Sequence, residues 1–126
     1  MKTISRRTVL RHLTTGLGVS AIGLAACRPS DFAELIDALA ALATDREAAS
    51  AIGRAFLDEY PGERRDPMAQ RLALELDWRT GMPAADLASA LLLRIERDFR
   101  DARTVRVNAW ILSQTEARWA ALTKLA

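Results

Sequence analysis

The sequence contains one histidine, His12, and one cysteine, Cys27, and both lie near the N-terminus. Imidazole and thiolate groups provide most ligands for zinc, copper, haem iron and iron–sulfur clusters, and a His-based catalytic triad needs the imidazole. If the segment before Cys27 is removed, the mature chain loses the imidazole of His12. If Cys27 is then acylated, the chain also has no free thiol. We therefore expect no catalytic residue, no cofactor and no metal site in it, and predict that it is not an enzyme.

Carboxylates are the remaining groups that are suited to acid–base chemistry, as in glycosidases. The densest acidic pairs are Asp58-Glu59 and Glu75 with Asp77. Neighbouring residues on a helix point in different directions, so neither pair is arranged to act on one substrate. No EF-hand loop, GxGxxG motif or P-loop occurs in the sequence. A carboxylate enzyme is therefore less favoured than either of the two functional hypotheses given below.

The first 26 residues have the organisation of a secretory signal. Residues 1–11 are basic and contain no acid, and residues 13–26 are moderately apolar and interrupted by glycines. The apolar part is shorter than the roughly 20 residues that a membrane-spanning helix needs. A positive segment, a short apolar segment and small residues at its end are typical of an export signal. The alternative is an amphipathic N-terminal helix.

The segment Ser5-Arg6-Arg7-Thr8-Val9-Leu10-Arg11 resembles the twin-arginine translocation motif, in which Ser or Thr precedes two arginines and apolar residues follow. Val9 and Arg11 replace the Phe and Lys that are frequent in that motif. The resemblance implies that residues 1–26 are a twin-arginine-type export signal. It also implies that the twin-arginine translocase, which moves folded proteins, recognises Arg6 and Arg7.

The next segment, Leu24-Ala25-Ala26-Cys27, resembles a lipobox, in which the cysteine is acylated and becomes the new N-terminus. The resemblance implies that Cys27 is the lipidation site and that the mature protein is anchored on the periplasmic side of a bacterial membrane. Two alternatives stay open. Cys27 could be a small buried thiol, or it could be lost with the leader, which would leave a soluble periplasmic protein.

The positive formal charge of the chain, +2, comes from the leader. Beyond residue 26 the sequence has 14 basic and 16 acidic residues, which gives a net charge of −2. Arginines alternate with acids there and form no cationic stripe of the kind that binds nucleic acid. We therefore expect no nucleic-acid partner.

Residues 27–126 should form a single all-α domain, a small bundle of about five helices with one short extended segment near 103–110. Apolar spacing, capping boxes and prolines set the expected helices. These are 31–43 after Ser30, a helix from the Thr44–Glu47 capping box to Tyr60, a helix from Asp66-Pro67 to Gly81, 84–101, and a last helix from the Ser113–Glu116 capping box.

Three details of this bundle can be predicted. Gly53 should allow close approach of another helix. Leu87, Leu91, Ile95 and Phe99 should form one apolar ridge, while pairs such as Arg94–Asp98 should lie on a solvated face. Val105 and Val107 indicate an extended segment, which should act as a connector, form a small hairpin or offer its edge to another protein.

The run from Val105 to Arg118, VRVNAWILSQTEAR, resembles small twin-arginine-signal proteins that accompany exported flavin-dependent alcohol and sugar dehydrogenases. Ala109 stands where that pattern often has Gly. The family's small subunits are helical and non-catalytic, and they act in maturation and export of the flavoprotein. The resemblance implies that Val105, Val107, Trp110 and Trp119 contact a partner; the alternative is that they belong to the core.

The preferred functional hypothesis is therefore an exported, lipid-anchored accessory subunit that escorts or tethers a larger flavin-dependent oxidoreductase. The alternative is a freestanding envelope lipoprotein that binds a small ligand or an envelope component.

Overall fold

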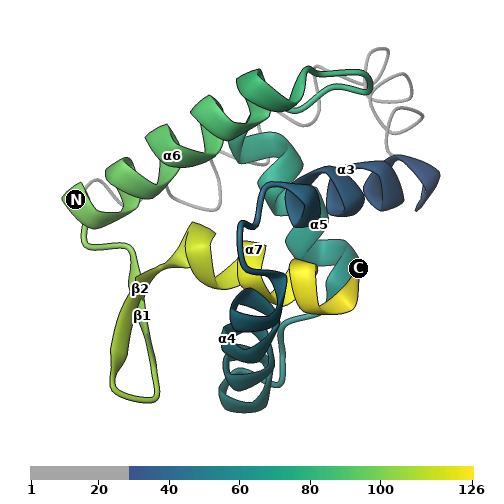
Figure 1. The fold of residues 1–126 in the computed structure, drawn as a ribbon. Coiled ribbons are helices and arrows are strands. Elements are labelled where there is room, and N and C mark those ends of the chain that lie inside the picture. The colour runs from purple at the N-terminus through teal and green to yellow at the C-terminus, as the bar shows by residue number, and fades with distance from the viewer. Residues whose placement is uncertain (1–28) are drawn as a thin grey trace, which may run out of the picture.

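The computed structural model describes residues 29–126, so Arg6 and Arg7 of the predicted signal and the predicted lipidation site Cys27 lie outside the described residues. The described chain folds into five helices and a two-stranded antiparallel sheet (Figure 1). In chain order these are α3 (Pro29–Ala41), α4 (Arg46–Glu59), α5 (Arg65–Glu75), α6 (Ala84–Arg100), β1 (Thr104–Val107), β2 (Trp110–Ser113) and α7 (Gln114–Leu125). The predicted all-α class with one short extended region is confirmed.

Helix α7 lies at the centre of the molecule, and α3, α4, α5 and α6 all contact it (Figure 1). Its small residues Ala117 and Ala121 are fully buried, and Leu122 is buried beside them. Small side chains on a helix let a neighbouring helix pack closely against it. The last helix of the sequence is thus the element around which the others pack.

The core is built from apolar residues at helical spacing on the surrounding helices. Its largest members are Phe32, Leu35, Ile36, Leu39, Phe56, Met68, Leu72, Leu76, Leu87, Leu91 and Leu122. Trp119 adds a hydrogen bond between two helices: its indole Nε1–H donates to the carbonyl oxygen of Leu39 at 2.8 Å. This bond fixes α7 to α3 at the edge of the core.

Gly53 is a point of close approach between α4 and α7, as its place in the sequence predicted. A Cβ on Gly53 would collide with the carbonyl oxygen of Ala120 and lie 2.8 Å from the Cα of Ala121. Both neighbours are backbone atoms, which cannot move aside as a flexible side chain can. Only glycine fits this crossing.

The helix starts differ slightly from those predicted. Asp45 rather than Thr44 caps α4, and its Oδ1 accepts a hydrogen bond of 3.0 Å from the N–H of Ala48. Helix α5 begins at Arg65, so Pro67 is its third residue rather than its first. Helix α3 begins at Pro29 and includes Ser30, which was expected to be its cap.

Helix α5 also ends earlier than predicted, at Glu75 rather than near Gly81. Asp77 adopts a left-handed conformation with φ +51°, and the N–H of Trp78 bonds to the carbonyl oxygen of Ala73 at 2.9 Å. This is the Schellman arrangement, which usually has glycine in the left-handed position. The sequence offers Asp there, so the end was missed.

The extended region pairs with itself. Strands β1 and β2 form an antiparallel hairpin in which Val105 faces Leu112 and Val107 faces Trp110. Asn108 begins the turn with φ +54°, a conformation that Asn tolerates better than most residues. Of the three possibilities predicted for this segment, the hairpin is confirmed, and it reaches Ser113 rather than ending near residue 110.

The second predicted capping box is confirmed at the start of α7. Ser113 Oγ accepts the N–H of Glu116 at 2.9 Å, and the Ser113 N–H donates to Glu116 Oε2 at 2.9 Å. The hairpin therefore joins α7 without a loop. None of the helices within residues 29–126 is long and apolar enough to cross a membrane.

Candidate functional site

The two faces of the hairpin have different surroundings because side chains alternate along each strand. Val105, Val107, Trp110 and Leu112 share one face by the strand register. Val107 is buried in the core, and Val105 and Leu112 are half-buried. Trp110, at the turn end of the same face, leaves 71% of its surface exposed. The hairpin is thus held against the core through Val107, and it presents a large exposed aromatic side chain directly across from Val107.

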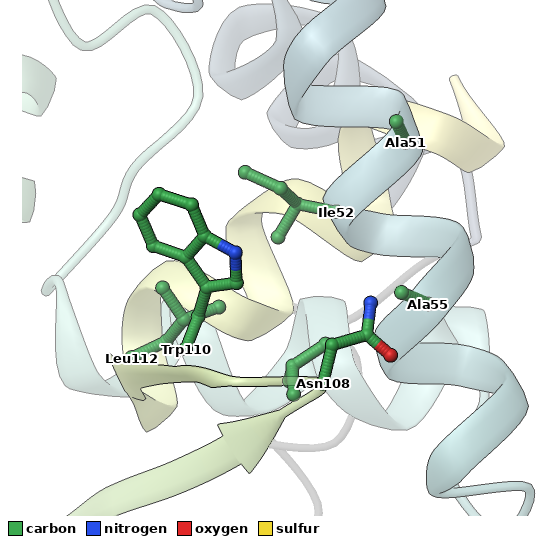
Figure 2. Close-up of a pocket in the computed structure, with 7 residues that line it drawn as sticks. Ala51, Ile52, Ala55, Asn108, Trp110 and Leu112 are labelled. Carbon is green, nitrogen blue, oxygen red and sulfur yellow. The ribbon is translucent and has the colours of Figure 1, made fainter.

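A groove of about 170 Å³ lies between this hairpin face and α4 (Figure 2). Its lining residues are Ala51, Ile52 and Ala55 from α4, with Val107, Asn108, Trp110 and Leu112 from the hairpin. Ile52 and the Trp110 indole face the same open space from opposite sides, and Ile52 is 41% exposed. We call this the α4–hairpin groove. Its lining is mainly apolar.

A second, more polar hollow of about 460 Å³ continues from the groove along α4. It shares Ala51, Ala55 and Asn108 with the groove. The residues that it adds are charged: Arg54, Asp58 and Glu59. We call it the acidic hollow. Together the two features form one depression with an apolar end and an acidic end.

Two hydrogen bonds hold the hairpin turn against the end of α4. Glu59 Oε2 accepts the N–H of Asn108 at 3.3 Å. The Tyr60 hydroxyl donates to the carbonyl oxygen of Arg106 at 3.2 Å. These contacts fix the position of the hairpin turn relative to the end of α4.

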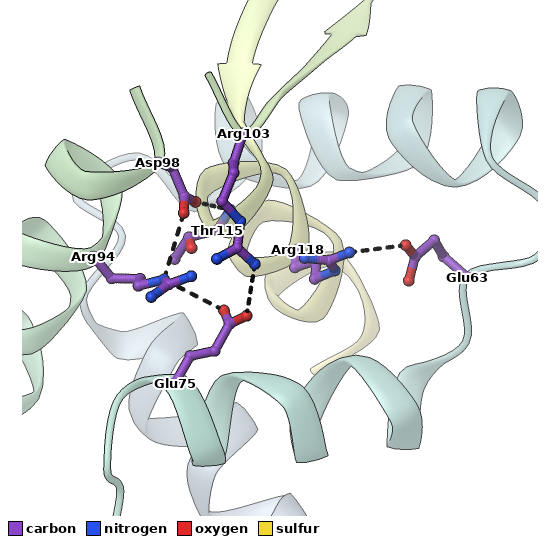
Figure 3. Close-up of polar contacts among 7 residues, drawn as sticks. All are labelled: Glu63, Glu75, Arg94, Asp98, Arg103, Thr115 and Arg118. Atoms are coloured by element: carbon purple, nitrogen blue, oxygen red, sulfur yellow. Dashed lines mark hydrogen bonds and ion pairs between the residues drawn. The ribbon is translucent and has the colours of Figure 1, made fainter. Parts of the chain in front are cut away.

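A separate buried network joins α5, α6 and the start of α7 (Figure 3). Asp98, only 1% exposed, accepts the N–H of Thr115 through Oδ2 at 2.9 Å, and its Oδ1 lies 3.4 Å from Arg94 Nε. Glu75 contacts Arg94 at 3.7 Å and Arg103 at 3.4 Å. An acid at a helix N-terminus is favoured by the N–H groups and the helix dipole.

This network corrects the prediction for α6. The Arg94–Asp98 pair exists, but it lies on the buried side of the helix rather than on a solvated face. The apolar ridge is correspondingly shorter: Leu87 and Leu91 are buried, Ile95 is half-buried and Phe99 is 47% exposed. The buried side of α6 continues through Arg94 and Asp98 because it meets Glu75 and the start of α7.

Arg118 is a second buried charge, 8% exposed, on the face of α7 toward the loop before α5. Its Nη2 lies 3.3 Å from Glu63 Oε1 (Figure 3). Its Nε and Nη1 are buried without a hydrogen-bond partner among the described residues. Arg118 therefore ties α7 to this loop through one contact only.

The predicted partner-contact residues separate into two places. Val107 and Trp110 both line the α4–hairpin groove, and Val105 lies on the same hairpin face. Trp119 lies on α7 outside the groove, half-buried, with its indole N–H bonded to Leu39. Whether these residues contact a partner stays a prediction. Trp110 alone among them has most of its surface available.

Sequence reasoning missed the opposite wall of the groove. The apolar spacing of α4 predicts a buried position for Ile52, whereas its side chain is 41% exposed at the groove. Asp58 and Glu59 are exposed, as expected, but their place beside the groove depends on how the hairpin folds back. Within residues 29–126, no group of three or more His, Cys, Asp or Glu side chains is placed to hold a metal ion.

No family model matches the chain, and no curated protein or solved structure is significantly similar to it.

Proposed function

We propose that this chain is an exported, lipid-anchored, non-catalytic accessory subunit that escorts or tethers a larger oxidoreductase, and that the α4–hairpin groove is the docking surface. One observation carries the proposal: Trp110 is 71% exposed beside an apolar groove. Tryptophan is among the residues most enriched at the energetic centres of protein interfaces. A partner that covers the indole would remove a large apolar surface from water.

The fixed position of the hairpin backbone that carries Trp110 supports a role of this residue in recognition. Its cross-strand partner Val107 is buried, and the Tyr60–Arg106 and Glu59–Asn108 hydrogen bonds fix the turn to α4. A side chain held on a rigid element loses little conformational freedom on binding. Ile111, 61% exposed on the other face of β2, extends the apolar surface beyond the groove.

The predicted leader supports export together with a partner. Arg6-Arg7 in a twin-arginine frame sends folded proteins across the membrane, and acylation of Cys27 would keep the complex at the membrane surface. Two or more acyl chains anchor a protein far more firmly than one. A flavin-dependent dehydrogenase subunit without its own signal would fold, bind this chain in the cytoplasm and cross with it.

Two variants test the proposal in the native host. Replacing Arg6 and Arg7 by lysines should leave a signal-less flavoprotein in the cytoplasm, because lysine does not reproduce the paired guanidinium groups. Cys27→Ser should move both proteins from the membrane to the soluble fraction. Fractionation with flavin absorbance and mass spectrometry reads out both results. Unchanged export of every flavoprotein in the double-lysine strain would overturn the escort function.

The alternative function, a freestanding lipoprotein that binds a small ligand, is favoured by the size of the groove. Its volume of about 170 Å³ is close to that of cavities, about 150 Å³, that hold a benzene-sized molecule. Titration of the purified chain with small aromatic compounds distinguishes the two functions, and comparison of its tryptophan fluorescence with that of a Trp110→Phe variant identifies the Trp110 signal. Micromolar binding in the absence of any protein partner would favour the ligand-binding function.

A further inference from the structure

We infer that the segment that occupies the α4–hairpin groove carries a leucine- or phenylalanine-sized side chain with a lysine or arginine two or three residues away. The inference rests on the proposed function, since it describes the chemistry of the partner at the same surface. The apolar side chain enters the groove, and the basic side chain lies in the acidic hollow.

The apolar half of the motif follows from the groove. Ile52 and Trp110 form opposing walls, and the small side chains of Ala51 and Ala55 leave space between α4 and the hairpin (Figure 2). A volume of about 170 Å³ accommodates one side chain of the size of Leu or Phe. A charged side chain there would lose its hydration without gaining a partner, because the groove lining contains no charged residue.

The basic half follows from the acidic hollow. Two carboxylates, Asp58 and Glu59, and one guanidinium, Arg54, line it, so its net charge is negative. Neither Asp58 nor Glu59 forms an ion pair with another residue within the described range 29–126. Glu59 uses one oxygen for the Asn108 N–H, and carboxylate oxygens have capacity for further donors. A cation from a partner finds two free acceptors there.

The spacing between the two halves follows from α4. Ile52 and Asp58 are six positions apart on the helix, which corresponds to about 9 Å along its axis. An extended peptide advances about 3.3 Å per residue. Two or three residues of an extended segment therefore bridge the distance from groove to hollow.

Two synthetic peptides test this chemistry against the processed, acylated chain purified from membranes in detergent. The first is a ten-residue Gly/Ser peptide that carries Phe and Lys three positions apart, and the second has Glu in place of Lys. The readout is the NMR signal of the Trp110 indole N–H, which a Trp110→Phe variant identifies. At low salt we expect the Phe/Lys peptide to bind about three- to five-fold more tightly than the Phe/Glu peptide. This factor lies within the range for exposed ion pairs.

Asp58→Asn combined with Glu59→Gln is the decisive variant. Both positions are exposed, and the amide side chain that replaces Glu59 keeps an oxygen that can accept the Asn108 N–H, so the fold should be retained. The variant should bind the two peptides equally, whereas Ile52→Ser should weaken binding of both. Equal binding of the peptides by the native chain, preference for Lys that persists in the double variant, or no response of Trp110 to either peptide would overturn the inference.

The inference and the proposed function fail in different ways. If the peptides are distinguished but no flavoprotein is exported with this chain, the escort function is wrong and the recognition chemistry of the groove stands. If a flavoprotein depends on the chain for export but binds the Asp58→Asn, Glu59→Gln variant as tightly as the native chain, only the inference is wrong.

Discussion

The environment of Asp98 in the folded protein determines whether its side chain is buried or exposed. The same sequence spacing, Arg94 followed by Asp98 four residues later, would describe an exposed pair on most helices. Here the carboxylate is 1% exposed and accepts a hydrogen bond from the N–H of Thr115 in the first turn of α7. The burial could not be predicted from α6 alone, because it depends on Glu75 of α5 and on the start of α7. By contrast, Gly53 could be interpreted from its place on an apolar helix face.

Asp98→Ala should lower the free energy of unfolding by about 3 kcal/mol, because it leaves the Thr115 N–H without its acceptor and removes the nearer of the two carboxylates that contact Arg94. Urea unfolding followed by circular dichroism measures the change. Asp58→Ala, at an exposed position, is the control and should stay within about 0.5 kcal/mol of the native chain. Equal effects of the two substitutions would show that the buried network contributes nothing to stability.

Gly53→Ala should destabilise the protein by about 3 kcal/mol or more, although alanine is the better helix former. The added Cβ would collide with the Ala120 carbonyl and force α4 away from α7. Gly62→Ala is the matched control, since a Cβ at Gly62 meets no atom within 4 Å. A melting temperature unchanged by Gly53→Ala would contradict the close α4–α7 crossing.

The elements themselves were predictable where local sequence carries the signal. Apolar spacing predicted five helices, and the Ser113 capping box marked the start of α7. Alternating valines indicated extended structure, but the pairing of β1 with β2 needed the turn at Asn108, which lacks the glycine of the commonest hairpin signals. The end of α5 was similarly concealed, because Asp77 rather than glycine takes the left-handed position. The end of α6 was predicted to within one residue, although Ala102 takes the left-handed position there.

Ala102→Gly should therefore stabilise the protein by about 0.5–1 kcal/mol. Ala102 has φ +56° just after α6, and the N–H of Arg103 bonds to the Asp98 carbonyl oxygen at 2.7 Å. A residue with a Cβ is strained in this conformation, whereas glycine is not. Thermal unfolding should show a higher midpoint. Ala85→Gly in the first turn of α6 should lower it, and a drop for both variants would refute the expected relief of strain.

At the scale of the whole molecule, the helices converge on the last segment of the chain. Because α7 contacts α3, α4, α5 and α6, the bundle is complete only when the C-terminal residues are present. The sequence predicted the all-α fold class, which follows from composition and periodicity. It did not predict the groove, which requires α4 and the hairpin to be placed together in space.

Copurification tests the central claim, that the molecule acts through contact at the Trp110 surface. The full chain carries a C-terminal affinity tag, is expressed in its native host and is purified from membranes; flavin absorbance and mass spectrometry identify what remains bound. We predict that a flavin-dependent dehydrogenase subunit is retained by the native chain and by Leu74→Ser, a control at a 74% exposed position on α5. Trp110→Ser should lose that subunit while keeping the melting temperature of the native chain. Retention of the same amount of flavoprotein by the Trp110→Ser variant would contradict the account.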